Sequence, residues 1–430
     1  MKKKLHFVRA RRTFFFLAIM LFFSFCFAQQ KETKVITVED AVSLALENNI
    51  SIKRNQITLE TLELKNKYSW NSVSPSISAS ADYKQQNDNY SLNATGSLSI
   101  RLSPSVYTSI QSAKINYEMG KISYEQAVKS VELEVRNAFY QMLYAKENLS
   151  LLERNLETAK QRYNLNREKY QKGQLSELDL LSAQYSYESL IPNIEASQIN
   201  MENNMSTFKQ MLGLDQTEKI ELSGSLDDFL SSFDFTLSFD INEIPSIKNL
   251  NFQIESAENQ LLATRFSAYG PSANLGFSAG KDLKNIENDF SFSLSAGVSI
   301  PLDGFLPWSS GGLSVANQKS SLEDLKLQLE NQKTTLEIQI QNNSKKIMQA
   351  QSQLELLEKN VELAQKKYDM TQTAYNHGSK DFLTLQNAAD SLMNAKISLM
   401  SQKITLLNAV LSLENTLGLP FGTLMNEESK

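Results

Sequence analysis

Cysteine and histidine are almost absent from this chain. Its 430 residues include one cysteine, Cys26, and two histidines, of which only His377 lies outside the N-terminal segment. Disulfide frameworks and zinc sites need several such residues. Thiol catalysis and a Ser-His-Asp set need well-placed ones, and no Gly-rich phosphate loop follows a predicted strand. We therefore expect a protein that is not an enzyme and that carries no metal and no cofactor.

Glycine and proline are also scarce, with 15 and 8 copies. Seven of the glycines fall between residues 270 and 312, so long stretches elsewhere are free of them, as long helices require. Beyond the N-terminus no segment is apolar enough to cross a membrane as a helix. A net charge of −5 and the signs of export given next argue against nucleic acid as a partner.

The N-terminal residues 1–28 have a basic start, an apolar run and a small residue, Ala28, before a polar sequence. This pattern predicts a cleaved secretory signal peptide. Its removal would take the net charge from −5 to −11. A membrane-spanning helix is the alternative, but the apolar run of about 16 residues is short for a span of about 20. Lipidation of Cys26 is a second alternative, which the bulky Phe25 before it disfavours.

The chain is an internal duplication with an offset of 205 residues. Residues 151–173 read LLERNLETAKQRYNLNREKYQKG, and residues 356–378 read LLEKNVELAQKKYDMTQTAYNHG. The match continues without a gap to Leu212-Gly213-Leu214 and Leu417-Gly418-Leu419. Repeats of this kind are the first constraint on a fold, so we expect two copies of one unit of about 200 residues.

Each copy predicts a helix, two strands with period-two alternation, a very long helix, a Tyr-x-x-Gly turn and a returning helix. Thr37 to Asp40 resembles a capping box at the start of the first helix, and Pro192 should kink or break the first returning helix. The predicted helices cover about 37–67, 106–171 and 176–212, then 241–268, 313–376 and 381–417. The predicted organisation is a signal peptide 1–28, a first structural repeat 29–220 with strands at about 73–84 and 89–103, a linker or equatorial segment 221–240, a second repeat 241–419 with strands at about 272–281 and 288–302, and a polar C-terminal tail 420–430.

The lengths of these elements predict an oligomer. A helix of about 65 residues is about 98 Å long, too long for one compact domain. The strands have about the length that crosses a bilayer at a tilt, yet four strands are too few for a membrane barrel. Three copies would supply twelve. A soluble β-sandwich is the alternative for the strands, although strand pairs isolated between such long helices disfavour it.

The signal peptide, the duplicated unit and the paired turns together resemble the TolC-type outer membrane efflux proteins, over residues 37–419. The resemblance implies a mainly α homotrimer, in which a 12-stranded outer membrane β-barrel is continued by a long periplasmic α-helical barrel. It also implies a passive exit duct of a tripartite efflux or type I secretion system, located in the outer membrane. The implied partners are outer membrane lipid, a periplasmic adaptor and an inner membrane transporter.

The resemblance also implies roles for residues at the turns. A periplasmic gate would be latched by Asp179 with Tyr375 and Lys380. A partly exposed latch of this kind is weak enough to open, and lysine in place of the family's arginine loosens it. Constriction-lining positions fall on Thr384 and Asn387, where the family often has two acids, so we expect a weakly charged constriction. The positions implied to contact the adaptor are Gly173, Gln174, Leu175, Gly378, Ser379 and Lys380.

Plainer interpretations of the same residues stay open. Both glycines would end a helix in any fold. Asp179 would favour a helix dipole as a first-turn acid. The tyrosines spaced seven apart, Tyr163 with Tyr170 and Tyr368 with Tyr375, are also typical of a helix seam, above all the first of each pair. His377 is expected to be a solvated turn residue.

Two other functions stay open at this point. A trimeric coiled-coil surface stalk would share the signal peptide and the long helices, although it would not need the duplication or the returning helices. Within the duct class, the sequence does not separate the export of small molecules from the secretion of proteins.

Overall fold

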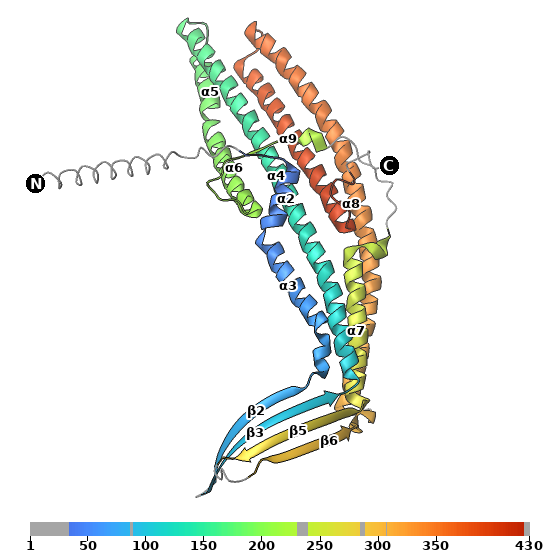
Figure 1. Ribbon diagram of the computed structural model, residues 1–430. Coiled ribbons are helices and arrows are strands. Elements are labelled where there is room, and N and C mark those ends of the chain that lie inside the picture. Colours follow the sequence, from blue (N-terminus) through green and yellow to red (C-terminus); the bar gives the residue numbers. More distant parts are fainter. Residues whose placement is uncertain (1–33, 87–88, 230–239, 284–288, 307, 425–430) are drawn as a thin grey trace, which may run out of the picture.

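The computed structural model describes residues 34–86, 89–229, 240–283, 289–306 and 308–424. The predicted signal peptide and the end of the predicted tail lie outside these ranges. Figure 1 shows an elongated molecule, with a four-stranded sheet at one end and two helical hairpin turns at the other. This is the mainly α fold with a small β part that the element lengths predicted.

Two helices of 67 residues, α4 (Ser105–Gln171) and α8 (Ser310–Asn376), run from the sheet to the turns. Each is about 100 Å long at 1.5 Å per residue. Ser309 caps α8 by accepting a hydrogen bond from the Gly312 amide at 3.0 Å. The predicted long helices are therefore confirmed to within three residues at each end.

The helix predicted over 37–67 is wrong in one respect, because it is two helices, α2 (Val38–Asn48) and α3 (Ile50–Lys67). Asn49 between them has extended backbone and caps α3, since its side chain accepts a hydrogen bond from the Ser51 amide at 2.8 Å. The predicted capping box is present at Thr37 and Asp40.

The first returning helix is broken as predicted, into α5 (Glu177–Glu188) and α6 (Ile191–Leu212). Pro192 stands at the second position of α6, where its missing N–H has no helical acceptor to lose. In the second copy, α7 (Pro245–Tyr269) and α9 (Phe382–Leu417) are both continuous. Helices α3, α5 and α6 pack along α4, whereas α7 and α9 pack along α8 and also contact α4.

The sheet has the order β2–β3–β5–β6, all antiparallel, so the two copies meet at its centre. Its strands are β2 (Ser76–Gln86), β3 (Asn89–Leu102), β5 (Ser272–Asp282) and β6 (Ser291–Ser299). Strand β2 begins later than predicted because residues Ser69–Val73 form a 3₁₀ helix, η1. Strands β2 and β6 are the two edges.

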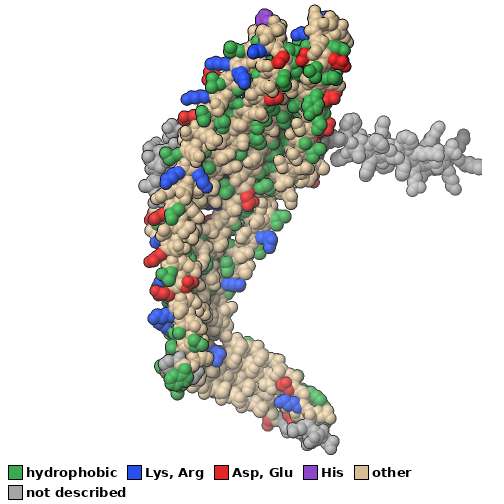
Figure 2. Space-filling model, turned by 180° about the vertical axis from the view of Figure 1, so that it is seen from behind, with side chains coloured by type: hydrophobic (Ala, Val, Ile, Leu, Met, Phe, Trp, Pro, Cys, Tyr) green, Lys and Arg blue, Asp and Glu red, His purple; other side chains and the backbone are tan. Residues whose placement is uncertain are grey.

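The two faces of the sheet differ sharply. Ile77 lies opposite Leu98, which in turn lies opposite Phe277, on one face. The other face carries serines that pair across the strands, with hydroxyl distances of 2.6 Å for Ser76–Ser99 and 2.7 Å for Ser78–Ser97. Figure 2 shows a sheet surface that is nearly free of charged side chains except toward its ends.

The middle of the molecule holds the main core. Phe139 and Leu143 of α4 are buried there with Phe208 of α6 and Leu407 of α9. Beside it, β1 (Lys34–Ile36) pairs in parallel with β4 (Ile220–Leu222), so the start of the predicted linker belongs to a small two-stranded sheet. The short 3₁₀ helices η2 (Leu226–Phe229) and η3 (Ile241–Glu243) follow, and η4 (Asp303–Phe305) precedes α8.

The start of the predicted C-terminal tail is packed against this core. Glu414 is fully buried, and its carboxylate accepts hydrogen bonds from the amides of Gly422 at 3.0 Å and Leu424 at 2.7 Å. Arg136, which makes a bidentate ion pair with Glu39, lies over the ring of Phe421 at 5.7 Å. The tail therefore connects the end of the second copy to the first.

Candidate functional site

The two hairpin turns have the same backbone. Gly173 has φ +71° and Gly378 has φ +74°, both in the left-handed region. In each turn the amide of the next residue returns to a carbonyl five residues earlier, Gln174 to Lys169 at 2.8 Å and Ser379 to Ala374 at 2.9 Å. No atom lies within 4 Å of an added Cβ, so backbone conformation alone requires glycine here.

In both helices that follow the turns, the side chain of the capping residue accepts a hydrogen bond from the amide three residues later. The acid and the hydroxyl residue have changed places between the two copies. In the first copy Ser176 is the cap, its hydroxyl accepting from the Asp179 amide at 3.1 Å and donating to the Asp179 carboxylate at 2.7 Å. In the second copy the carboxylate is at the cap, Asp381, and accepts from the Thr384 amide at 2.9 Å. Hydrogen bonds from Thr384 lower the pKa of Asp381.

Two tyrosines of α8 cross from the second hairpin to the first. The Tyr375 hydroxyl donates to Asn166 Oδ1 at 2.7 Å, and Lys169 Nζ lies 5.1 Å from the centre of the Tyr375 ring. Asn166 is buried, with 1% of its surface exposed. Two turns of α8 further from the tip, the Arg162 guanidinium donates to the Tyr368 hydroxyl and lies 5.2 Å from its ring centre. These contacts join α4 to α8 near the turns.

The equivalent tyrosines of the first copy make no such crossing. Tyr163 stacks on Tyr187 of its own hairpin, with ring centres 6.1 Å apart and an interplanar angle of 5°. Tyr170 is exposed. Tyr163 and Tyr368 both lie between packed helices, as the helix-seam interpretation expects, and Tyr368 also bonds Arg162 of the other hairpin.

The residues of the expected latch lie at this end of the molecule. Within one chain the Asp179 carboxylate accepts from Ser176, while Tyr375 donates to Asn166. Burial raises the pKa of Tyr375, the bond to Asn166 opposes this, and the negative charge of Asp179 raises it further. Lys380 is exposed beside the second turn.

The other expected positions are also near the tip. Asn387 is exposed and lines a shallow groove of about 450 Å³ with Leu181 and Tyr185 of α5, whereas Thr384 is occupied with the cap of α9. The positions implied to contact the adaptor, listed here together, are exposed except for the partly covered Leu175: Gly173, Gln174, Leu175, Gly378, Ser379 and Lys380.

The sequence did not point to Arg162 and Asn166, which are the donor to Tyr368 and the acceptor from Tyr375 in the two crossings. One signal could have found them. Arg162, Asn166 and Lys169 recur at steps of four and three, so they share one face of α4 with the polar groups needed to meet a tyrosine.

The described part of the chain contains no cluster of histidine, cysteine, aspartate and glutamate suited to a metal ion. Among the helices of the described ranges, none has the length and apolar character needed to cross a membrane.

Comparisons with known proteins agree with this architecture. Residues 41–214 and 240–419 match the family described as outer membrane efflux protein. A search of curated protein sequences gives no match. Among solved structures, the Campylobacter jejuni CmeC outer membrane channel is similar, with a TM-score of 0.75 and 19% identity over 89% of this chain and 85% of that one.

Two further structures are similar at comparable coverage. The open state of the Neisseria gonorrhoeae MtrE outer membrane channel has a TM-score of 0.73 and 19% identity, over 89% of each chain. The channel CusC has a TM-score of 0.77 and 15% identity, over 92% of this chain and 96% of that one. At these identities the likeness establishes a shared fold.

Proposed function

Because this chain belongs to the outer membrane efflux protein family, we propose that it forms the exit duct of a tripartite efflux or secretion system. The family is one of outer membrane channels, and the chain is an outer membrane efflux protein by membership. We propose further that it is a passive conduit for small molecules or proteins, without catalysis. The observation that carries this proposal is the open-edged sheet.

One chain leaves this sheet incomplete. Strands β2 and β6 each pair on one side only, and large apolar side chains of the sheet are exposed, Ile77 by 80% and Leu294 by 83%. In lipid each unpaired backbone group costs several kcal/mol. Closure on other copies removes the edges, and three copies supply twelve strands. The apolar face would then contact lipid, and the serine face would line the lumen.

The helices support the same assembly. Along α8 the side chains of Leu356, Leu363 and Met370 are exposed by 58%, 64% and 74%. They recur every seven residues, the spacing of a coiled-coil seam. We propose that this stripe packs against a neighbouring copy, so that the helices of three chains form a tube continuous with the barrel.

The turn end is then the far end of the duct, where we propose the gate. Asp179, Tyr375 and Lys380 remain the proposed latch, joined by Arg162 and Asn166, whose bonds hold the hairpins together. Opening would separate α4 from α8 and break the two crossings. Thr384 and Asn387 remain the proposed constriction, which would be polar and uncharged at these positions.

The proposed partners follow from the family. A periplasmic adaptor would bind the turns at Gly173, Gln174, Leu175, Gly378 and Ser379, and an inner membrane transporter would supply the energy. Residues 1–28 would direct export and be removed. A coiled-coil surface stalk is the second candidate, but no observation favours it, since a stalk needs no matched pair of hairpins.

The test is single-channel conductance in a planar bilayer, combined with native mass measurement in detergent. We expect a trimer that conducts weakly when closed and more strongly when the crossings are removed. A monomer, or a trimer that never conducts under any condition, would overturn the duct and favour the stalk.

A further inference from the structure

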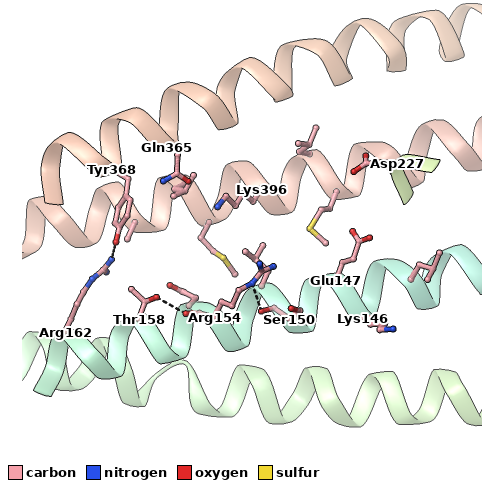
Figure 3. A pocket seen from close by; sticks show the side chains of 18 of the residues that line it. Lys146, Glu147, Ser150, Arg154, Thr158, Arg162, Asp227, Gln365, Tyr368 and Lys396 are labelled. Carbon is pink, nitrogen blue, oxygen red and sulfur yellow. Dashed lines mark hydrogen bonds between the residues drawn. The ribbon is translucent and has the colours of Figure 1, made fainter. Parts of the chain in front are cut away.

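A cavity of about 750 Å³ lies between the two hairpins. Helices α4 and α9 form its long sides, and α8 contributes Gln365 and Tyr368. The Arg162–Tyr368 crossing lies at one end of the cavity and Asp227 lies toward the other (Figure 3). The cavity is therefore built within one chain, between the core and the turns.

The charges around this cavity are unbalanced. Among the acids that line it, Asp227 is paired with Lys403, and Glu147 has an interaction of its own. Lys146 is paired with Glu221 at 3.4 Å. Arg154 makes one hydrogen bond, from its Nε to the Ser150 carbonyl at 3.2 Å, which leaves its terminal nitrogens unused in the part of the chain that the structure describes.

Lys396 has no hydrogen bond or ion pair to any described residue. Arg154 on α4 and Lys396 on α9 both point into the space between these helices (Figure 3). Two like charges that face one cavity repel each other, and an anion placed between them is attracted to both and offsets that repulsion. A chain of net charge −5 thus keeps two unpaired cations at one site.

The α9 wall of the cavity is apolar apart from Lys396, whereas α4 also contributes the polar Ser150, Asn155 and Thr158. Leu392, Met393, Leu399 and Met400 of α9 line the cavity beside Leu151 of α4. Methionine side chains adapt their shape to irregular ligands. Binding sites for small molecules have this composition, an apolar wall with a few polar groups that fix orientation, and volumes of roughly 300–1,000 Å³.

We infer that this cavity binds a small anionic amphiphile, with its carboxylate or sulfonate between Arg154 and Lys396 and its apolar body against Met393 and Leu392. Because the site lies within one chain, this inference does not depend on export. Arg162 lies at the edge of the same cavity, where its guanidinium holds the neutral Tyr368 hydroxyl. A bound anion would accept a stronger hydrogen bond from that guanidinium than the neutral hydroxyl does.

The test uses 1-anilinonaphthalene-8-sulfonate with the full protein in phosphatidylcholine nanodiscs, and subtracts the signal of empty discs. N-phenyl-1-naphthylamine, which has the same aromatic body without the sulfonate, is the matched uncharged probe. We expect saturable sulfonate binding, weakened about tenfold or more in R154Q/K396Q. The variant K319Q, which removes an exposed lysine of α8, should bind as the wild type does.

The charge-conserving variant R154K/K396R guards against a folding defect and should keep binding within about threefold. Sulfonate binding that is the same in R154Q/K396Q as in K319Q would overturn the inference. So would equal losses for the charged and uncharged probes. Conductance of R154Q/K396Q is a separate readout, so a failed duct and a failed anion site would give different results.

Discussion

The two hairpin tips share a backbone and differ in chemistry. Both turn on a left-handed glycine, and both returning helices start from a cap at the equivalent position, Ser176 or Asp381. In one the hydroxyl caps and the acid follows, while in the other the acid caps and the hydroxyl of Thr384 follows. The two copies therefore share the backbone geometry of the turn but differ in where the charged side chain stands.

The equivalent tyrosines of the two copies also make different contacts. Tyr163 remains inside its hairpin, whereas its equivalent Tyr368 bonds Arg162 of the other one. Tyr170 is exposed, whereas its equivalent Tyr375 bonds Asn166. One copy therefore supplies the tyrosines of the hairpin contact and the other supplies their partners. Two identical copies would not place the tyrosines on one hairpin and their partners on the other.

The largest effect, on stability, is expected at the C-terminal ends of the two copies, where α6 and α9 end. Both close on a left-handed glycine, but Glu414 accepts two backbone amides, whereas its equivalent Lys209 donates to the Gln216 carbonyl at 3.2 Å. E414A leaves two buried donors unpaired and should lower the free energy of unfolding by about 2–4 kcal/mol. The control K209A should lower it by about 0.5 kcal/mol or less. Urea unfolding followed by circular dichroism measures both, and equal losses would contradict this account.

The same residue predicts a pH dependence. Burial raises the pKa of Glu414, so the folded state favours its protonated form. Its contribution to stability is therefore greatest below about pH 4.5, the ordinary range of glutamate, and declines as the pH rises through the folded pKa. The stability of the wild type relative to E414Q should fall between pH 4 and pH 7 in urea titrations. A difference that stays constant over this range would show that Glu414 does not titrate as described.

The next prediction tests whether only the tyrosines of the second copy hold the two hairpins together. Y368F/Y375F removes both crossing hydroxyls, each of which contributes about 0.5–1.5 kcal/mol. We expect single-channel conductance to rise severalfold, because the closed tip loses its cross-hairpin bonds. The matched variant Y163F/Y170F removes the equivalent hydroxyls of the first copy and should leave conductance unchanged. Similar increases in both variants would mean that the crossings do not hold the tip closed.

A smaller effect separates the two roles of Asp179. D179A should raise conductance, since the proposed latch loses its acid, and should also weaken the α5 cap. S176A removes the capping hydroxyl and keeps the acid, at a cost of about 1 kcal/mol of helix stability. Conductance that rises in D179A but not in S176A assigns the effect to the latch. If both variants behave alike, the carboxylate acts only through the cap.

The smallest effect concerns ion selectivity. T384D/N387D places two acids where the proposed constriction is uncharged, and three chains would turn them into rings of negative charge. We expect the reversal potential in a salt gradient to shift toward the cation value by roughly 10–20 mV. The control T334D/N343D adds two acids elsewhere, on α8. An unchanged reversal potential in T384D/N387D would place these side chains outside the lumen.

Much of the fold could be predicted from local pattern. The 205-residue repeat, the period-two strands and the Tyr-x-x-Gly turns each depend on neighbouring residues, and the observed helices and strands follow them closely. The break at Asn49 was missed because asparagine interrupts an apolar pattern no more than other polar residues do. Strands β1 and β4 were missed because each has three residues, too few for a period to register.

The candidate site was predictable only in part. The turn glycines follow from local backbone needs, and the sequence placed Tyr375 correctly at the tip. The partners Arg162 and Asn166 depend on how α4 and α8 are rotated toward each other, which two sequences spaced by about 200 residues do not reveal. The unpaired charges of Arg154 and Lys396 are likewise a property of packing, since both residues are ordinary on a helix surface.

The unbroken length of α4 and α8 has a mechanical consequence. Each is a lever that passes the core near its middle, with an arm of roughly 45 Å on either side. A tilt of about 5° about that fulcrum would move the turn end by roughly 4 Å, with no change inside the helix. The flanking helices of the first copy are interrupted at Asn49, near the core, and at Ser189, nearer the turns. A tilt of α4 as one piece therefore meets flanking helices that are divided on both sides of its middle.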